Sequence, residues 1–144
     1  MSQTVFAGEI SDLLVDHREW SSDEFCEEHR VLTERLAELR EVADRMTSMA
    51  PHEVGARLER ICGLLANRIV PHVRSEHEHR AYLATRAGRP IPGREQEAEI
   101  ERSADLFIAV WESVPSGTAG PPHSLRGLLF DLHALLRLHF DAGC

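Results

Sequence analysis

The stretch Ile69-Val-Pro-His-Val-Arg-Ser-Glu76 puts two polar residues, His72 and Glu76, on the apolar face of a predicted helix. Residues four apart on a helix point in nearly the same direction. A buried carboxylate is costly unless it is paired or bound to a metal. The sequence therefore raises the question of which groups meet Glu76 in the core. The residues leading into the pair are spaced by three and four, which is typical of a buried helix face: Leu58, Ile61, Leu65 and Ile69.

The composition is that of an ordinary globular domain without a basic surface. The chain has 144 residues, of which 42% are hydrophobic and 28% charged, and its net charge is −8. A chain of this length can bury one core, and the negative charge argues against nucleic acid as a partner. All 16 basic residues are arginine, so lysine-based catalysis is excluded. The unusual feature is the presence of 9 histidines.

Nothing in the sequence predicts export or membrane insertion. The N-terminus is acidic and lacks the apolar segment of a secretory signal, and no stretch approaches the ~18 apolar residues of a membrane-spanning helix. The cysteines Cys26, Cys62 and Cys144 are widely spaced without a C-x-x-C pair, which fits a reducing cytosol better than a disulfide framework. We therefore expect a cytoplasmic protein in which Cys26 is a buried, inert thiol.

Apolar residues recur at spacings of three and four in four segments, which predicts four long helices. Residues 1–20 are expected to form an arm that carries a short amphipathic helix. Pro71 removes a backbone donor and should bend the second helix just before His72. Helices of similar length joined by short breaks predict an all-α, up-down-up-down four-helix bundle over residues 21–144. The expected boundaries are a capping pattern at Ser21-Ser-Asp-Glu24, a start at Pro51, and breaks at Gly88–Gly93 and Pro115–Pro122.

Polar residues on the apolar stripes are expected to meet at one end of this bundle. His29 lies near the start of the first helix, and His72 and Glu76 lie late in the second. Glu97 begins the third helix and His139 ends the fourth. Antiparallel neighbours put the start of one helix beside the end of the next, so these residues share one height. Mixed imidazole and carboxylate groups with open positions suit Fe(II) and oxygen chemistry, and imidazole also suits zinc and copper.

Other polar residues near this height are weaker candidates. His77 lies beside the apolar stripe and could still reach a metal, although one or both of His77 and His79 are expected to face solvent. His133 is a packing residue or a partner of a ligand. Glu97 itself could be a solvated carboxylate favoured by its helix N-terminus. No nucleophile or nucleotide-binding motif is present, so the catalytic residues stay unknown.

Three segments resemble the hemerythrin-like (HHE cation-binding) family: Glu28-His-Arg30, Pro71-His-Val-Arg-Ser-Glu76 and Leu132-His-Ala-Leu-Leu-Arg-Leu-His-Phe140. The resemblance covers nearly all of the chain from about residue 22. It implies a four-helix bundle around a non-heme di-iron centre, with five histidines and two bridging carboxylates in the fullest form. Members of that family carry or sense oxygen, handle nitric oxide or peroxide, or store and sense iron. Carried over to this chain, the ligands are His29, His72 and His139, with Glu76 as a bridging carboxylate.

The chain departs from the family pattern at three places. Gln96-Glu97 stands where the third helix normally offers a histidine, and Gly143 and Cys144 stand where the fourth normally supplies a carboxylate. His77 replaces an acid that often follows the glutamate of the second helix. These losses weaken the second metal position most. They leave open a mononuclear site, an asymmetric pair completed by Glu97 or His77, and a mainly structural site.

The leading hypothesis is a metal-binding protein that uses one or two non-heme iron ions to bind or sense oxygen, nitric oxide or redox state. Zinc or manganese are alternative metals. An enzyme of oxygen or peroxide chemistry and a metal-free helical interaction module are the alternative functions. Leu128, Phe130, Leu135 and Leu138 widen the apolar surface of the fourth helix, which predicts a further contact with the N-terminal arm or with a second copy as a homodimer.

Overall fold

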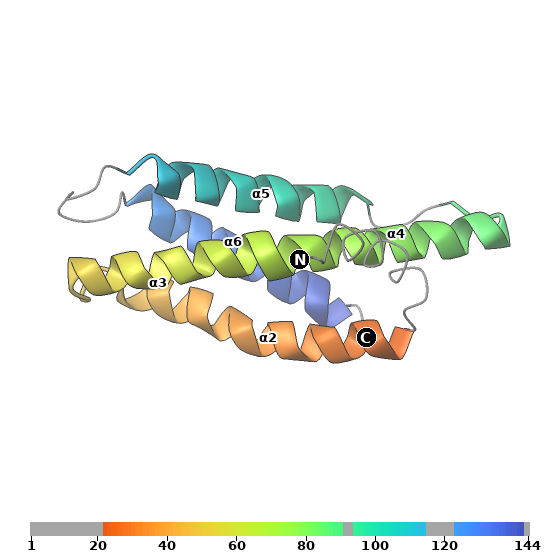
Figure 1. Cartoon of the computed structure of the whole chain (residues 1–144), viewed down its shortest axis with the longest axis horizontal. Coiled ribbons are helices and arrows are strands. Elements are labelled where there is room, and N and C mark those ends of the chain that lie inside the picture. The colour runs from red at the N-terminus through yellow and green to blue at the C-terminus, as the bar shows by residue number, and fades with distance from the viewer. Residues whose placement is uncertain (1–21, 91–93, 115–122, 143–144) are drawn as a thin grey trace, which may run out of the picture.

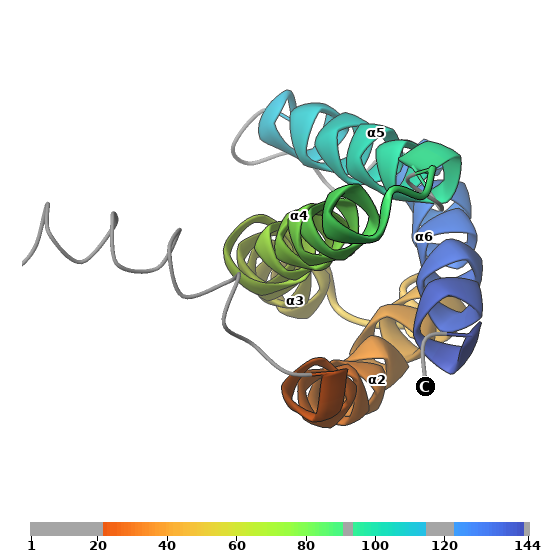
Figure 2. The ribbon, with the colours of Figure 1, turned by 90° about the vertical axis from the view of Figure 1, so that its right-hand side faces the viewer.

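The computed structural model describes residues 22–90, 94–114 and 123–142, and its regular structure there is entirely helical (Figure 1). The helices alternate in direction, and seen end-on they surround a common centre (Figure 2). This confirms the predicted all-α four-helix bundle. The arm expected at residues 1–20 lies outside the described residues. The elements are α2 (Ser22–Arg45), α3 (Pro51–Leu64), η1 (Leu65–Ile69), α4 (Val70–Ala87), α5 (Arg94–Glu112) and α6 (Ser124–Ala142).

The second rod of the bundle consists of α3, η1 and α4 placed end to end, and η1 is a π-helical turn. Its backbone signature is the hydrogen bond from the Val70 N–H to the Leu65 carbonyl, five residues back. Proline has no N–H and its ring clashes with the carbonyl four residues earlier in an α-helix. A wider turn just before Pro71 relieves that clash. The predicted disturbance at Pro71 therefore takes the form of a π turn, a feature that often lies beside functional sites.

The rod ends where the sequence predicts a break. Gly88 adopts a left-handed backbone conformation with φ of 67°. Its N–H and that of Arg89 donate to the carbonyls of Thr85 and Ala84, at 3.2 and 2.8 Å. This pair of bonds, in which two N–H groups beyond the helix donate to carbonyls of its last turn, is a common way in which a glycine ends a helix. It fixes the length of α4 and lets α5 return along the bundle.

Most of the core is apolar and contains residues from every helix, among them Leu36, Leu58, Phe107 and Leu129, none of which is exposed. Burying each such side chain stabilises the fold by ~1.5–3 kcal/mol. Among the described residues, the buried polar side chains gather toward one end of this core: His29, His72, Ser75, Glu76, His79, Glu97 and His139. The bundle thus has an apolar end and a polar end.

Most of the wide apolar surface of α6 is covered within the chain itself. Leu128, Phe130 and Leu135 pack against the core, while Leu138 is exposed. The Phe130 ring lies under the guanidinium groups of Arg40 and Arg126, at 5.3 and 5.0 Å from the ring centre. A contact of α6 with a second copy stays a prediction.

Two further predictions concern compartment. No helix in the described part of the chain is both long and apolar enough to cross a membrane. Cys62 is a free thiol, but Cys26 is disulfide-bonded. The expectation that Cys26 is an inert thiol in a chain without disulfides is therefore wrong.

Candidate metal centre

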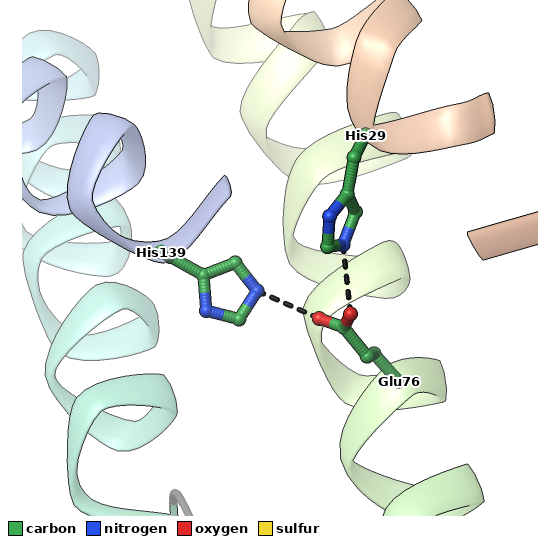
Figure 3. Close-up of side chains that lie close together, drawn as sticks. All are labelled: His29, Glu76 and His139. Carbon is green, nitrogen blue, oxygen red and sulfur yellow. Dashed lines mark hydrogen bonds and ion pairs between the residues drawn. The ribbon is translucent and has the colours of Figure 1, made fainter. Parts of the chain in front are cut away.

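Three buried residues from three helices meet at the polar end of the core: His29 of α2, Glu76 of α4 and His139 of α6 (Figure 3). His29 Nε2 lies 2.7 Å from Glu76 Oε2, and His139 Nε2 lies 2.7 Å from Glu76 Oε1. One ligand atom from each residue lies within 4.8 Å of the others. Metal–ligand bonds of ~2.0–2.2 Å put neighbouring ligands roughly 3–3.5 Å apart, so a small outward movement of the two imidazoles from Glu76 would give the spacing that an ion needs.

His72 faces the same point from α4, one turn before Glu76. Its Nε2 lies 3.9 Å from Glu76 Oε1 and has no hydrogen-bond partner among the described residues. Its Nδ1 contacts the Glu28 carboxylate. Burial lowers the pKa of His72 and outweighs the opposing effect of Glu28, which favours a neutral ring. The proton then sits on Nδ1, where it is donated to Glu28, and the Nε2 lone pair points into the core.

The orientation of His139 is fixed in the same way by the third rod. Its Nδ1 lies 3.1 Å from Gln96 Oε1, whose amide oxygen accepts the ring N–H. A histidine that binds a metal through one nitrogen usually donates its other N–H to an oxygen acceptor. Without a metal, the contact from His139 Nε2 to Glu76 is a hydrogen bond only if both ring nitrogens carry protons. A cation between the two groups would replace that proton.

Glu76 is held as a carboxylate despite its depth. Burial by itself raises the pKa of a carboxyl group, but the hydrogen bonds from His139 and His29, together with their charges, bring the pKa of Glu76 below its usual range. The side chain is only 8% exposed. A negative charge at this depth is an anchor for a positive ion.

Aromatic rings close the centre on the side of α6 and α2. The Phe140 ring lies 5.1, 5.8 and 5.3 Å from the imidazole rings of His29, His72 and His139. Phe25 packs edge-on against His72 at 5.8 Å. These apolar walls exclude water and strengthen the electrostatic interactions inside.

Glu97 lies beside this centre and not within it. It is 3% exposed, so the alternative of a solvated carboxylate is wrong. His77 Nδ1 lies 2.8 Å from Glu97 Oε1, and the other carboxylate oxygen of Glu97 contacts the Arg80 guanidinium. His77 therefore reaches Glu97, while the group formed by His29, Glu76 and His139 lies on the other side of Arg80.

Two more histidines occupy other places. His79 is buried with its ring 5.0 Å from Phe25, and the His77 side chain is only 19% exposed. The expectation of solvent exposure is therefore wrong for His79, while His77 is partly exposed and lines a cavity between α4 and α5. His133 is half-buried in a groove with Arg40 and Asp44, apart from the centre.

Several residues that contact the proposed ligands had no predicted role. Glu28 is paired with His72, and Phe140 touches three imidazoles. Arg80 follows Glu76 by four residues, which is the spacing of a helical ion pair and could have suggested the contact. No such spacing predicts the contacts of Glu28 or Phe140, because these contacts join different helices and depend on how each helix is rotated about its axis.

The donor set fits a first-row metal ion. His29, Glu76 and His139 surround one point, and His72 Nε2 lies beside them, 3.9 Å from Glu76 Oε1 and without a hydrogen-bond partner in the described structure. Glu28 and Gln96 orient the imidazoles of His72 and His139. Such mixed sets are those of iron and zinc sites. Compared with known proteins, the chain matches no protein-family model, no curated protein and no solved structure.

Proposed function

We propose that this chain is a hemerythrin-like metal-binding protein that holds non-heme iron through His29, His72, Glu76 and His139. The observation that carries the proposal is the buried convergence of His29, Glu76 and His139, with the His72 Nε2 atom 3.9 Å from Glu76 Oε1 and lacking a hydrogen-bond partner in the described structure. A buried polar atom without a partner is costly in a folded protein. Coordination of a metal would satisfy this atom.

Iron is the metal that this donor set favours. Structural zinc sites are usually tetrahedral and rich in cysteine, and no cysteine is among the proposed ligands. Around a six-coordinate Fe(II) ion, one carboxylate and three imidazoles would leave two positions open for diatomic ligands. Zinc and manganese could use the same residues. Bound iron supplies reversible binding of oxygen or nitric oxide and a change of oxidation state.

The chain's own residues have distinct tasks in this proposal. Glu76 provides the anionic ligand, and Glu28 and Gln96 hold the imidazoles of His72 and His139 with Nε2 inward. Phe140 keeps bulk water from the centre. These roles support binding or sensing of a small diatomic molecule.

The test is the metal content of the purified protein after anaerobic loading with Fe(II), followed by optical spectra on exposure to oxygen or nitric oxide. We expect bound iron and a spectral change with either gas. Glu76→Gln and His72→Ala should lose the metal, while His133→Ala should keep it. Failure to bind iron, zinc or manganese under any loading condition would overturn the proposal.

One observation favours a metal-free alternative, in which the cluster serves only to specify the packing of the bundle. Both oxygens of Glu76 already contact imidazoles without any ion. Replacing His72 and Glu76 together by leucine separates the two functions. If the bundle becomes more stable and no binding property changes, the polar cluster is a packing device.

A further inference from the structure

Arg80 places a positive charge between two buried carboxylates beside the proposed metal centre. One terminal nitrogen of its guanidinium lies 3.5 Å from Glu76 Oε1, and the other contacts Glu97 Oε2. The two carboxylate side chains are 8% and 4% exposed. A carboxylate at such depth needs a cation nearby, and removal of that cation is strongly unfavourable.

This environment sets Arg80 apart from the surface ion pairs of the bundle. Arg74, on the same helix, pairs with Glu101 at 2.7 Å, but the Glu101 side chain is 28% exposed and that of Arg74 is 58% exposed. Arg40 and Asp44 are about half exposed. Exposed pairs of this kind contribute ~0–1 kcal/mol. Arg80 instead neutralises a carboxylate that is a proposed ligand.

The groups around the Arg80 guanidinium would otherwise form a second cation site. Glu97 offers one oxygen to His77 and the other to Arg80, and Glu76 offers Oε1. Two carboxylates and an imidazole are ordinary ligands of iron, zinc or manganese. A cavity of about 140 Å³ between α4 and α5 lies beside two of these groups and is lined in part by His77, Glu97 and Glu101.

We propose that Arg80 occupies the second cation position of the centre, so that the protein binds a single metal ion. This inference rests on the proposed function, because it presumes an ion at His29, His72, Glu76 and His139. The guanidinium supplies the charge that a second ion would supply between Glu76 and Glu97. Its removal should open that position to a metal held by Glu97, His77 and a shared oxygen of Glu76.

The experiment measures Fe(II) equivalents per chain after anaerobic saturation and removal of free metal. Wild type should bind one equivalent, and Arg80→Gln should bind two. Arg80→Lys keeps a positive charge and should stay at one. Arg74→Gln, the matched control, removes an exposed guanidinium that lines the same cavity and should also stay at one. Adding Glu97→Gln to Arg80→Gln should return the value to one.

The outcomes separate the two proposals. Wild type that binds no metal refutes the proposed function. Wild type that binds two equivalents, or an Arg80→Gln chain that binds only one, refutes the role of Arg80 and leaves metal binding standing. If Arg80→Gln unfolds without metal, Fe(II) should refold it with two equivalents, as followed by circular dichroism. A variant that stays unfolded in excess Fe(II) also overturns the inference.

Discussion

At the scale of single residues, two hydrogen-bond acceptors fix how the imidazole rings of the candidate centre are turned. His72 and His139 are each pinned by an oxygen acceptor on one ring nitrogen, Glu28 and Gln96 respectively, and this leaves the other nitrogen facing Glu76. In the proposed function, this arrangement of acceptor, imidazole and inward lone pair would orient each ligand before an ion binds. It also raises the basicity of the imidazole toward the ion.

Replacing Glu28 by glutamine should weaken metal binding without unfolding the protein. Glu28→Gln removes the charge that holds the His72 proton on Nδ1, and loss of such a partner typically lowers metal affinity by about 10–100-fold. Competition with a chelator of known affinity measures the change. Glu27→Gln, which alters an exposed neighbour paired with Arg30, is the control and should bind as wild type does. Equal affinities for the two variants would contradict this role of Glu28.

Cys62 should be an unreactive thiol in the folded chain. Burial raises its pKa to about 12, with smaller contributions from Glu59 and Glu112. An acid with a raised pKa stays protonated as pH increases, so at pH 8 only about one thiol in ten thousand is the reactive thiolate. Iodoacetamide labelling with peptide mapping should show slow modification of Cys62 at pH 8 and much faster modification in urea. Similar rates in the two conditions would contradict the pKa shift.

The folded state should also lose stability above about pH 9, where the unfolded thiol ionises first.

At the scale of elements, the second rod could be predicted only in part. The spacing of its apolar residues predicted which residues the rod spans, and Gly88 predicted where it ends. The π turn η1 could not be predicted from the spacing of apolar residues. One π turn differs from an α turn by less than one residue, and that difference is hidden in a pattern that already mixes spacings of three and four. Pro71 was the signal for a disturbance, but a kink and a π turn satisfy a proline equally well.

Deleting Asn67 tests whether η1 accommodates Pro71. Asn67 is an exposed residue within the π turn, and its deletion should turn η1 into ordinary α-helix while keeping the two halves of the rod in phase. Pro71 would then clash with the carbonyl four residues earlier, at a cost of ~3 kcal/mol. Urea unfolding should show that loss in the wild-type background and a much smaller one in Pro71→Ala. Asn67→Ala keeps the length and should change little. Equal losses in both backgrounds would show that the π turn has another cause.

The molecule as a whole is divided into an apolar end and a polar end, and the sequence predicted that division well. Helix periodicity located the four rods, and antiparallel order put His29, His72, Glu76 and His139 at one height. The spacing of apolar residues does not fix how far each helix is rotated about its own axis. Glu97 therefore lies beside Arg80 instead of in the cluster, and His79 is buried where solvent was expected.

This division predicts that core stability and metal binding can be changed separately. Phe107 lies ten residues after Glu97, roughly 15 Å along α5. Phe107→Ala should destabilise the fold by ~3–5 kcal/mol. An ion that binds only the folded state raises its stability by ~4 kcal/mol at a thousandfold excess over Kd. Thermal melts with Fe(II) and with a chelator should show the same metal-induced gain in Phe107→Ala as in wild type. A gain that disappears with Phe107 would mean that the two ends are coupled.

The position of Phe140 bears on how fast an ion could enter or leave the proposed centre, as well as on how tightly it would bind. Its buried ring touches three imidazoles and covers the centre from the side of α6. An ion or gas molecule that enters or leaves on that side must wait for the ring and the end of α6 to move. Exchange of a bound ion by that route would therefore depend on how often the helix ends open, and a weakly bound ion could stay long behind a ring that moves rarely.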